Sequence, residues 1–79
     1  VDATFIDECG TRVIIDWKTS SPRKGESEGS FMIREVERYR EKMAQYGKIY
    51  QKIDGRENTV KLQLYFVRIR KLMEIPISL

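Results

Sequence analysis

One long amphipathic segment constrains this chain more than any other feature. Between residues 31 and 53, large apolar side chains recur at alternating intervals of three and four, which places them on one stripe of a helix. Glu35 and Glu37 lie near its start and lysines near its end, as the helix dipole favours. We predict a helix over 31–53 with Gly55 as its C-terminal cap. Its apolar stripe consists of Val36, Tyr39, Met43, Tyr46, Tyr50 and Ile53.

Runs rich in β-branched and aromatic residues precede this helix. Residues 1–6 ("VDATFI") and 12–19 ("RVIIDWKT") predict two strands, and the turn-forming residues between them predict a hairpin over 1–19. We expect Gly10 to take a positive φ at the end of a three-residue loop. Residues 20–30 are rich in Ser, Gly and charged side chains, so we expect a solvated, mobile loop there.

Two further strands follow the helix. Along 59–69, apolar side chains alternate with polar ones, as they do in a half-buried strand. Residues 72–77 predict a final edge strand, because Pro76 lacks the backbone donor that an inner strand needs. A strand–helix–strand connection makes the two joined strands parallel. The sequence therefore predicts one α+β domain over 1–79, with a mixed sheet in β-β-α-β-β order and one long flanking helix.

Two charged side chains interrupt the apolar strand over 12–19. Asp16 and Lys18 lie two residues apart and so point to the same face, while Trp17 points to the other. Charged residues are rarely buried without a partner, so we expect the helix to cover the face that carries Trp17. This interpretation places Trp17 in the core, against Tyr39, Met43 or Tyr46.

The predicted hairpin also sets which residues oppose each other. A turn centred on Cys9 places Asp2 opposite Asp16, with Cβ atoms about 4.5–5.5 Å apart. Two carboxylates this close repel each other unless a positive group lies between them. Lys18 supplies one positive charge, and a hard divalent ion such as Mg²⁺ supplies two. The alternative is a plain Asp16–Lys18 ion pair on a solvent-exposed sheet.

Composition excludes several classes of protein. The lone Cys9 and the absence of His exclude an internal disulfide and a Cys/His zinc site. No apolar run reaches the roughly 18 residues of a membrane span, and no signal-peptide pattern is present. We expect an intracellular protein, and a net charge of +3 is compatible with a polyanionic partner. Because Val1 is not an initiator Met, we expect a fragment of a longer chain.

The hairpin ending in "VIIDWKTS", the polar loop and the helical segment "REVERYREKMAQYGKIYQKI" resemble the RecB/AddA-type branch of the PD-(D/E)xK nuclease superfamily. In that branch, an Asp-bearing strand forms a hairpin with a strand ending in "hhDYKT", and a later helix carries "YrxQLxxYaxal". The resemblance covers essentially the whole chain and implies a restriction-endonuclease-like core. Tyr39 and Tyr46 match the two helix tyrosines of this pattern, whereas Lys42 replaces its Gln.

The resemblance implies a role for each residue of the motif. Asp2 and Asp16 correspond to the metal-ligating carboxylates, and the backbone carbonyl of Trp17 corresponds to a third ligand. Lys18 corresponds to the catalytic lysine beside a bound Mg²⁺ or Mn²⁺, a metal that activates water and polarises the phosphate. Catalysis is therefore expected from Asp2, Asp16 and Lys18. Expected DNA contacts are Lys42, Tyr46, Arg23 and Lys24, with plain solvated side chains as the alternative for the three basic residues.

The function that the resemblance implies is a metal-dependent DNA exonuclease domain of a RecB/AddA-like helicase–nuclease in recombination and repair. Its partners are then DNA, UvrD/Rep-type helicase domains of the same parent chain and a partner subunit, with no membrane. The implied location is the bacterial cytoplasm, at the nucleoid. An upstream helix that contributes a His or Glu in relatives is not in this sequence, so the isolated chain need not be active. Two alternatives remain: a nuclease-like module that binds DNA or partner domains without cutting, and an unrelated α+β interaction domain.

Overall fold

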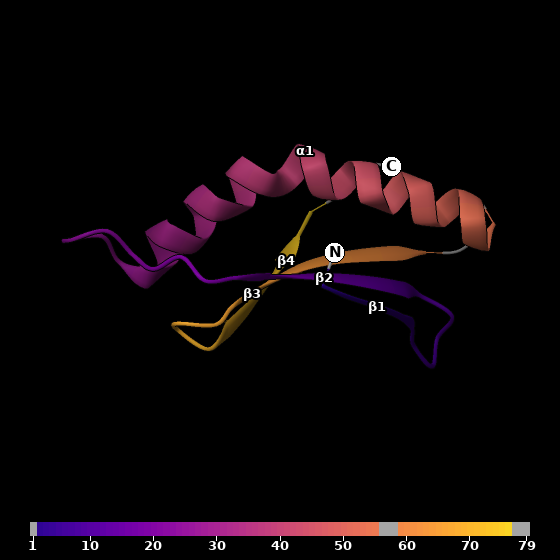
Figure 1. The fold of residues 1–79 in the computed structure, drawn as a ribbon, viewed down its shortest axis with the longest axis horizontal. Helices are drawn as coiled ribbons and strands as arrows, with labels where there is room; N and C mark the ends of the chain where they lie inside the picture. Colours follow the sequence, from indigo (N-terminus) through magenta and orange to yellow (C-terminus); the bar gives the residue numbers. More distant parts are fainter. Residues whose placement is uncertain (1, 56–58, 77–79) are drawn as a thin grey trace.

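A computed structural model of the chain describes residues 2–55 and 59–76. These residues form four strands and one long helix in the predicted β-β-α-β-β order, so the α+β class with a mixed sheet is confirmed. Figure 1 shows the helix lying along one face of the sheet, while no described element covers the opposite face. The elements are β1 (Ala3–Ile6), β2 (Arg12–Lys18), α1 (Glu28–Asp54), β3 (Val60–Phe66) and β4 (Lys71–Ile75).

The strands lie in the order β1-β2-β3-β4. β1 pairs with β2 and β3 pairs with β4 in antiparallel fashion, as short connections allow. β2 and β3 are parallel, as predicted, because the chain crosses between them through α1. The carboxyl ends of β2 and β3 therefore meet at the same edge of the sheet.

The hairpin register is as predicted. Ala3 pairs with Ile15, and the same alignment extended by one residue sets Asp2 opposite Asp16. The loop depends on Gly10, which has φ 81° and donates its N–H to the carbonyl of Asp7 at 3.0 Å.

Helix α1 begins earlier than the predicted residue 31. The Ser27 side chain accepts a hydrogen bond from the backbone N–H of Ser30 at 3.1 Å, which caps the first turn. The sequence pattern missed this turn because residues 28–30 are polar or Gly and carry no apolar stripe. At the other end, Gly55 caps the helix as predicted, with φ 107° and a hydrogen bond to the carbonyl of Gln51.

The strands after α1 are shorter than predicted. β3 ends at Phe66 because residues 67–70 form the turn into β4. β4 ends at Ile75, immediately before Pro76, which cannot donate to the ladder. β4 lies at the sheet edge, as predicted. The predicted strand ends at residues 1 and 77 fall outside the described part of the chain.

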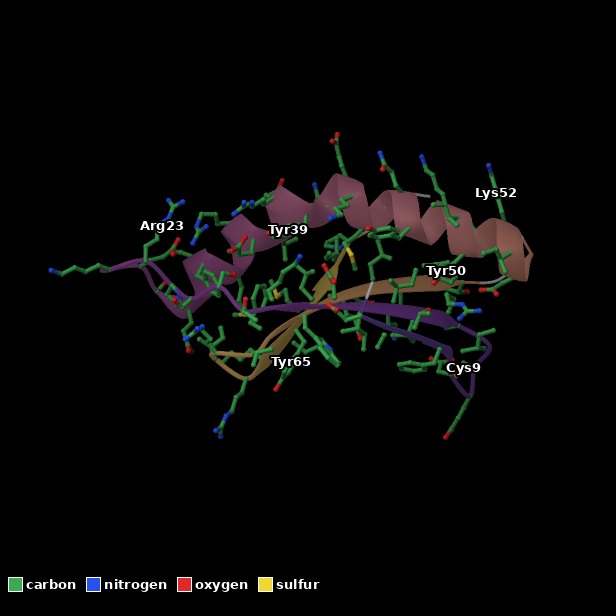
Figure 2. All side chains as sticks on the ribbon, in the orientation of Figure 1. Cys9, Arg23, Tyr39, Tyr50, Lys52 and Tyr65 are labelled. Carbon is green, nitrogen blue, oxygen red and sulfur yellow. The ribbon has the colours of Figure 1, made fainter. Side chains whose placement is uncertain are left out.

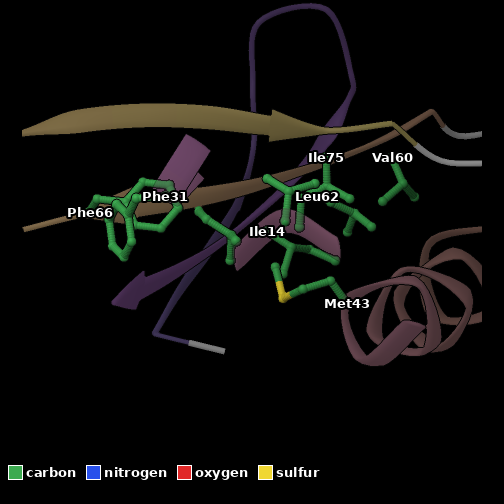
Figure 3. Close-up of a cluster of buried hydrophobic side chains, with 9 residues drawn as sticks. Ile14, Phe31, Met43, Val60, Leu62, Phe66 and Ile75 are labelled. Atoms are coloured by element: carbon green, nitrogen blue, oxygen red, sulfur yellow. The ribbon is translucent and has the colours of Figure 1, made fainter. Parts of the chain in front are cut away.

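The core lies between α1 and the facing side of the sheet (Figure 3). Phe31 and Phe66 meet edge to face, with ring centroids 5.2 Å apart. Val36 and Met43 of the predicted helix stripe are buried, and its three tyrosines pack against the core. Ile53 is an exception, because its side chain is 70% exposed near the helix end. The cluster consists of Ile14, Phe31, Val36, Met43, Val60, Leu62, Leu64, Phe66 and Ile75.

The predicted orientation of β2 is wrong. Trp17 is 55% exposed and lies on the face that α1 leaves uncovered, whereas Ile14 is fully buried beneath the helix. The partner strand explains this outcome, because Ile14 aligns with Leu62 and Asp16 with Leu64, both of which face the helix. Asp16 and Lys18 are therefore on the helix-covered face, where each supplies the other with a counter-charge.

Candidate functional site

The carboxyl end of β2, beneath the first half of α1, brings two oppositely charged side chains together. Lys18 Nζ lies 2.7 Å from Asp16 Oδ2, and only 14% and 15% of the two side chains are exposed. Both residues belong to the sequence-predicted site. Because they are largely shielded from water, their attraction is screened less than that of a surface ion pair.

Asp2, which directly precedes β1, lies beside this pair. Its backbone N–H donates to the carbonyl of Ile15 at 3.1 Å, and its Oδ2 accepts the backbone N–H of Trp17 at 2.7 Å. These two contacts hold the carboxyl of Asp2 beside that of Asp16. The structure thus brings together Asp2, Asp16 and Lys18, as the sequence predicted.

The pKa of Asp16 lies below its usual value. Burial alone would raise this pKa, since desolvation penalises the charged form, but the interactions with Lys18 and Asp2 outweigh burial. Asp16 is therefore a carboxylate at neutral pH. An ionised, partly buried oxygen ligand is the kind that a hard divalent cation prefers.

Tyr39 of α1 completes the surroundings of Lys18. Lys18 Nζ lies 3.5 Å from the centre of the Tyr39 ring, a cation–π contact from helix to strand. In Figure 2, Tyr39 projects from α1 toward the sheet, while Tyr65 lies on the opposite side of the sheet. The Lys18 ammonium is thus held between a carboxylate and an aromatic face.

Glu35 is a site residue that sequence analysis missed. It was interpreted as a dipole-favoured residue of the first helical turns, but it is 1% exposed. Its Oε1 accepts the hydroxyl of Ser20 at 2.8 Å, and its Oε2 accepts no hydrogen bond from the described residues. The available signal was its position, one helical turn before Tyr39 on the buried side of α1.

The oxygen donors present fit a hydrated divalent cation. Mg²⁺ usually binds through one or two carboxylates together with waters and substrate phosphates, and Asp2 and Asp16 supply two carboxyl groups. Within residues 2–55 and 59–76, no group of three or more His, Cys, Asp and Glu side chains is placed to hold a metal. A cation at Asp16 also has to displace the Lys18 ammonium.

The residues predicted to contact DNA lie on α1 and in the loop before it. Lys42 is exposed on α1, and Tyr46 packs against the core. Arg23 and Lys24 are exposed in the loop before α1, at the end of the molecule where Figure 2 labels Arg23. This loop contains a turn, because the backbone N–H of Glu26 donates to the carbonyl of Arg23 at 2.9 Å.

Comparison with protein-family models, curated proteins and solved structures found no match to this chain. In the part of the chain that the structure describes, no helix combines the length and apolar composition that a bilayer crossing requires.

Proposed function

We propose that this chain is the metal-dependent DNA-cleaving domain of a RecB/AddA-like helicase–nuclease, with a restriction-endonuclease-like core. The observation that carries the proposal is the gathering of Asp2, Asp16 and Lys18 at the carboxyl end of β2. These residues are the ones that the nuclease motif requires. Their proximity in the fold depends on the hairpin register, which aligns β1 with β2.

In the proposed site, Asp2 and Asp16 would hold Mg²⁺ or Mn²⁺ together with the backbone carbonyl of Trp17. The metal would polarise a phosphoryl oxygen and lower the pKa of a bound water. The Lys18 ammonium is largely shielded from water, so it stabilises negative charge that develops on the phosphate.

The basic residues outside the site suit a nucleic acid backbone. Lys42 on α1 and the loop residues Arg23 and Lys24 are exposed and free to approach phosphates, and the chain carries a net charge of +3. Contacts of this kind bind without reading sequence, and they weaken as salt concentration rises. They fit a nuclease that moves along DNA more readily than one that selects a target sequence.

One observation favours a second candidate, a nuclease-like module that binds DNA or partner domains without cutting. The Lys18 ammonium neutralises Asp16 directly, and Asp2 Oδ2 is engaged by the backbone N–H of Trp17. A site stabilised in this way needs no metal to fold.

Calorimetric titration of the chain with Mn²⁺ separates the two candidates. The cleaving domain binds the ion, and Asp16→Asn abolishes that binding while the fold persists. Lys42→Ala, an exposed charge change on α1, serves as the control and leaves the binding unchanged. Absence of Mn²⁺ binding by the unmodified chain, or equal binding by the Asp16→Asn variant, overturns the metal site.

A further inference from the structure

Glu35 is a buried carboxylate that the proposed cleavage chemistry does not use. Its Oε1 is held by Ser20, while Oε2 is buried and accepts no hydrogen bond among the described residues. Arg34 Nη1 lies 3.8 Å from Oε1, as a long ion pair. Arg34 is itself bound by two hydrogen bonds to Glu26. A buried acceptor without a donor costs folding free energy, so a donor that reaches Oε2 gains stabilisation there.

Two contacts place Glu35 beside the Lys18 site. Glu35 precedes Tyr39 by one turn of α1, so the two side chains are neighbours on the same helix face. The Lys18 ammonium lies over the Tyr39 ring. Ser20, two residues after Lys18, donates a hydrogen bond to the Glu35 carboxylate. Both residues therefore line the same wedge between α1 and the end of β2.

A divalent cation bound at Asp16 displaces the Lys18 ammonium, and Glu35 offers that ammonium another acceptor. The Lys18 ammonium lies 2.7 Å from Asp16 Oδ2, so a cation bound there repels it strongly. Only 14% of the Lys18 side chain is exposed, and a displaced ammonium that stays in this environment needs a new acceptor. The unused oxygen of Glu35 is a carboxylate acceptor within the same wedge.

We propose that Glu35 is a positioning residue for Lys18: its Oε2 receives the Lys18 ammonium when a divalent cation takes its place at Asp16. This inference rests on the proposed metal site. It adds that cation binding determines whether Lys18 contacts Asp16 or Glu35. In the metal-free chain, Lys18 stabilises Asp16. In the metal-bound chain, Glu35 keeps the ammonium close to the carboxylates instead of releasing it to solvent.

The first experiment needs no metal. Asp16→Asn removes the charge that holds Lys18, as cation binding is proposed to do. A crystal structure of this variant is expected to show Lys18 Nζ at about 2.7–2.9 Å from Glu35 Oε2, the range of a charge-assisted hydrogen bond. If Lys18 instead remains over Tyr39 without touching Glu35, or extends into solvent, the inference is wrong whether or not the chain binds metal.

The second experiment measures Mn²⁺ affinity by calorimetry at one fixed pH in the unmodified chain, Glu35→Gln and Glu37→Gln. Without this acceptor, the Lys18 ammonium competes more strongly with the cation for Asp16. The Glu35→Gln variant is therefore expected to bind Mn²⁺ about 10-fold more weakly than the unmodified chain. Glu37→Gln removes the same charge from an exposed position on α1 and should bind like the unmodified chain. Gln is isosteric with Glu, so we expect both variants to keep their packing. Urea denaturation of both variants checks that their free energy of unfolding is unchanged.

These measurements separate the two proposals. Equal Mn²⁺ affinity in Glu35→Gln and the unmodified chain overturns the role of Glu35 and leaves the metal site standing. Absence of Mn²⁺ binding by the unmodified chain overturns the metal site, and the Asp16→Asn structure then decides the Lys18–Glu35 contact by itself.

Discussion

Lys18 Nζ lies 3.5 Å from the centre of the Tyr39 ring, on the face of the sheet that α1 covers. The charged side of β2 is therefore the side that meets the helix. Trp17, the largest side chain of the strand, points to the uncovered face and is 55% exposed. The energetic consequences of this orientation can be measured separately from any activity.

Trp17→Ala is expected to change the free energy of unfolding by less than about 1 kcal/mol, because surface substitutions have small effects. Ile14→Ala removes a fully buried side chain from the same strand and is expected to cost about 2–5 kcal/mol. Urea denaturation followed by circular dichroism measures both. A loss for Trp17→Ala as large as that for Ile14→Ala would contradict the orientation of β2.

Fluorescence gives an independent check of the same orientation. Trp17 is the only tryptophan of the chain, so its emission reports one position. In the folded protein, acrylamide should quench this emission readily, because the side chain is more than half exposed.

The orientation of β2 could not be read from β2 alone. Apolar residues occupy both of its faces, so alternation gave no answer, and the charged pair was interpreted as the solvent side. The deciding information lies in β3, where Leu62 and Leu64 face the helix and align with Ile14 and Asp16. That alignment is a tertiary property of the parallel pairing. By contrast, the hairpin register follows from a local turn and was predicted correctly.

The same distinction applies to the site. Proximity of Asp2 and Asp16 was predictable because one tight loop sets it. Burial of Glu35 was not predictable, because a polar residue on a helix is normally assigned to the solvent side. Only the packing of α1 on the sheet shows that Glu35 is buried. Contacts that depend on the helix–sheet packing, such as Lys18 with Tyr39, were missed for the same reason.

Arg12 and Asp54 join the start of β2 to the end of α1. Arg12 donates from Nε and Nη2 to the two carboxylate oxygens of Asp54, each at 2.7 Å, and its guanidinium lies 5.0 Å from the centre of the Tyr50 ring. Lysine cannot reproduce this planar, two-bond geometry. Arg12→Lys is therefore expected to lower the thermal midpoint nearly as much as Arg12→Ala.

A double-mutant cycle with Asp54→Asn tests whether the Arg12 effect comes from this pair. If it does, the double variant is less destabilised than the sum of the single variants. Additive effects would show that Arg12 acts through packing on Tyr50 instead. Arg40→Ala, which removes an exposed arginine of α1, is the control and should have little effect.

The lowered pKa of Glu26 predicts how the stability of the chain changes with pH under acidic conditions. Hydrogen bonds from the Arg34 side chain, and then from the Arg23 backbone, lower the pKa of Glu26 from 4.5 to about 2. Because the folded-state pKa is depressed, this group contributes stability that is complete above pH 4.5 and is lost as pH falls toward 2. Glu26→Gln should therefore reduce stability at neutral pH and weaken its dependence on pH in this window.

The control for this titration is Glu37→Gln, an exposed glutamate 63% accessible to solvent. Its pH dependence between 4.5 and 2 should match that of the unmodified chain. Asp16 and Asp54 also have lowered pKa values and contribute to acid unfolding in both variants, so the comparison isolates Glu26. Identical acid curves for the Glu26→Gln and Glu37→Gln variants would contradict the assignment.

The last prediction concerns cleavage, in the helicase–nuclease that we propose contains this chain. Lys18→Ala is expected to reduce Mg²⁺-dependent DNA degradation by about 10²–10³-fold, the range for removing one group that stabilises transition-state charge, and to spare ATP hydrolysis. DNA affinity should hardly change, because affinity is shared among many phosphate contacts and Lys18 is largely shielded from solvent. Lys42→Ala should do the opposite, weakening binding slightly and reducing its salt dependence while leaving the rate at saturating DNA intact. Undiminished degradation by the Lys18→Ala protein would refute cleavage at this site and favour the module that binds without cutting.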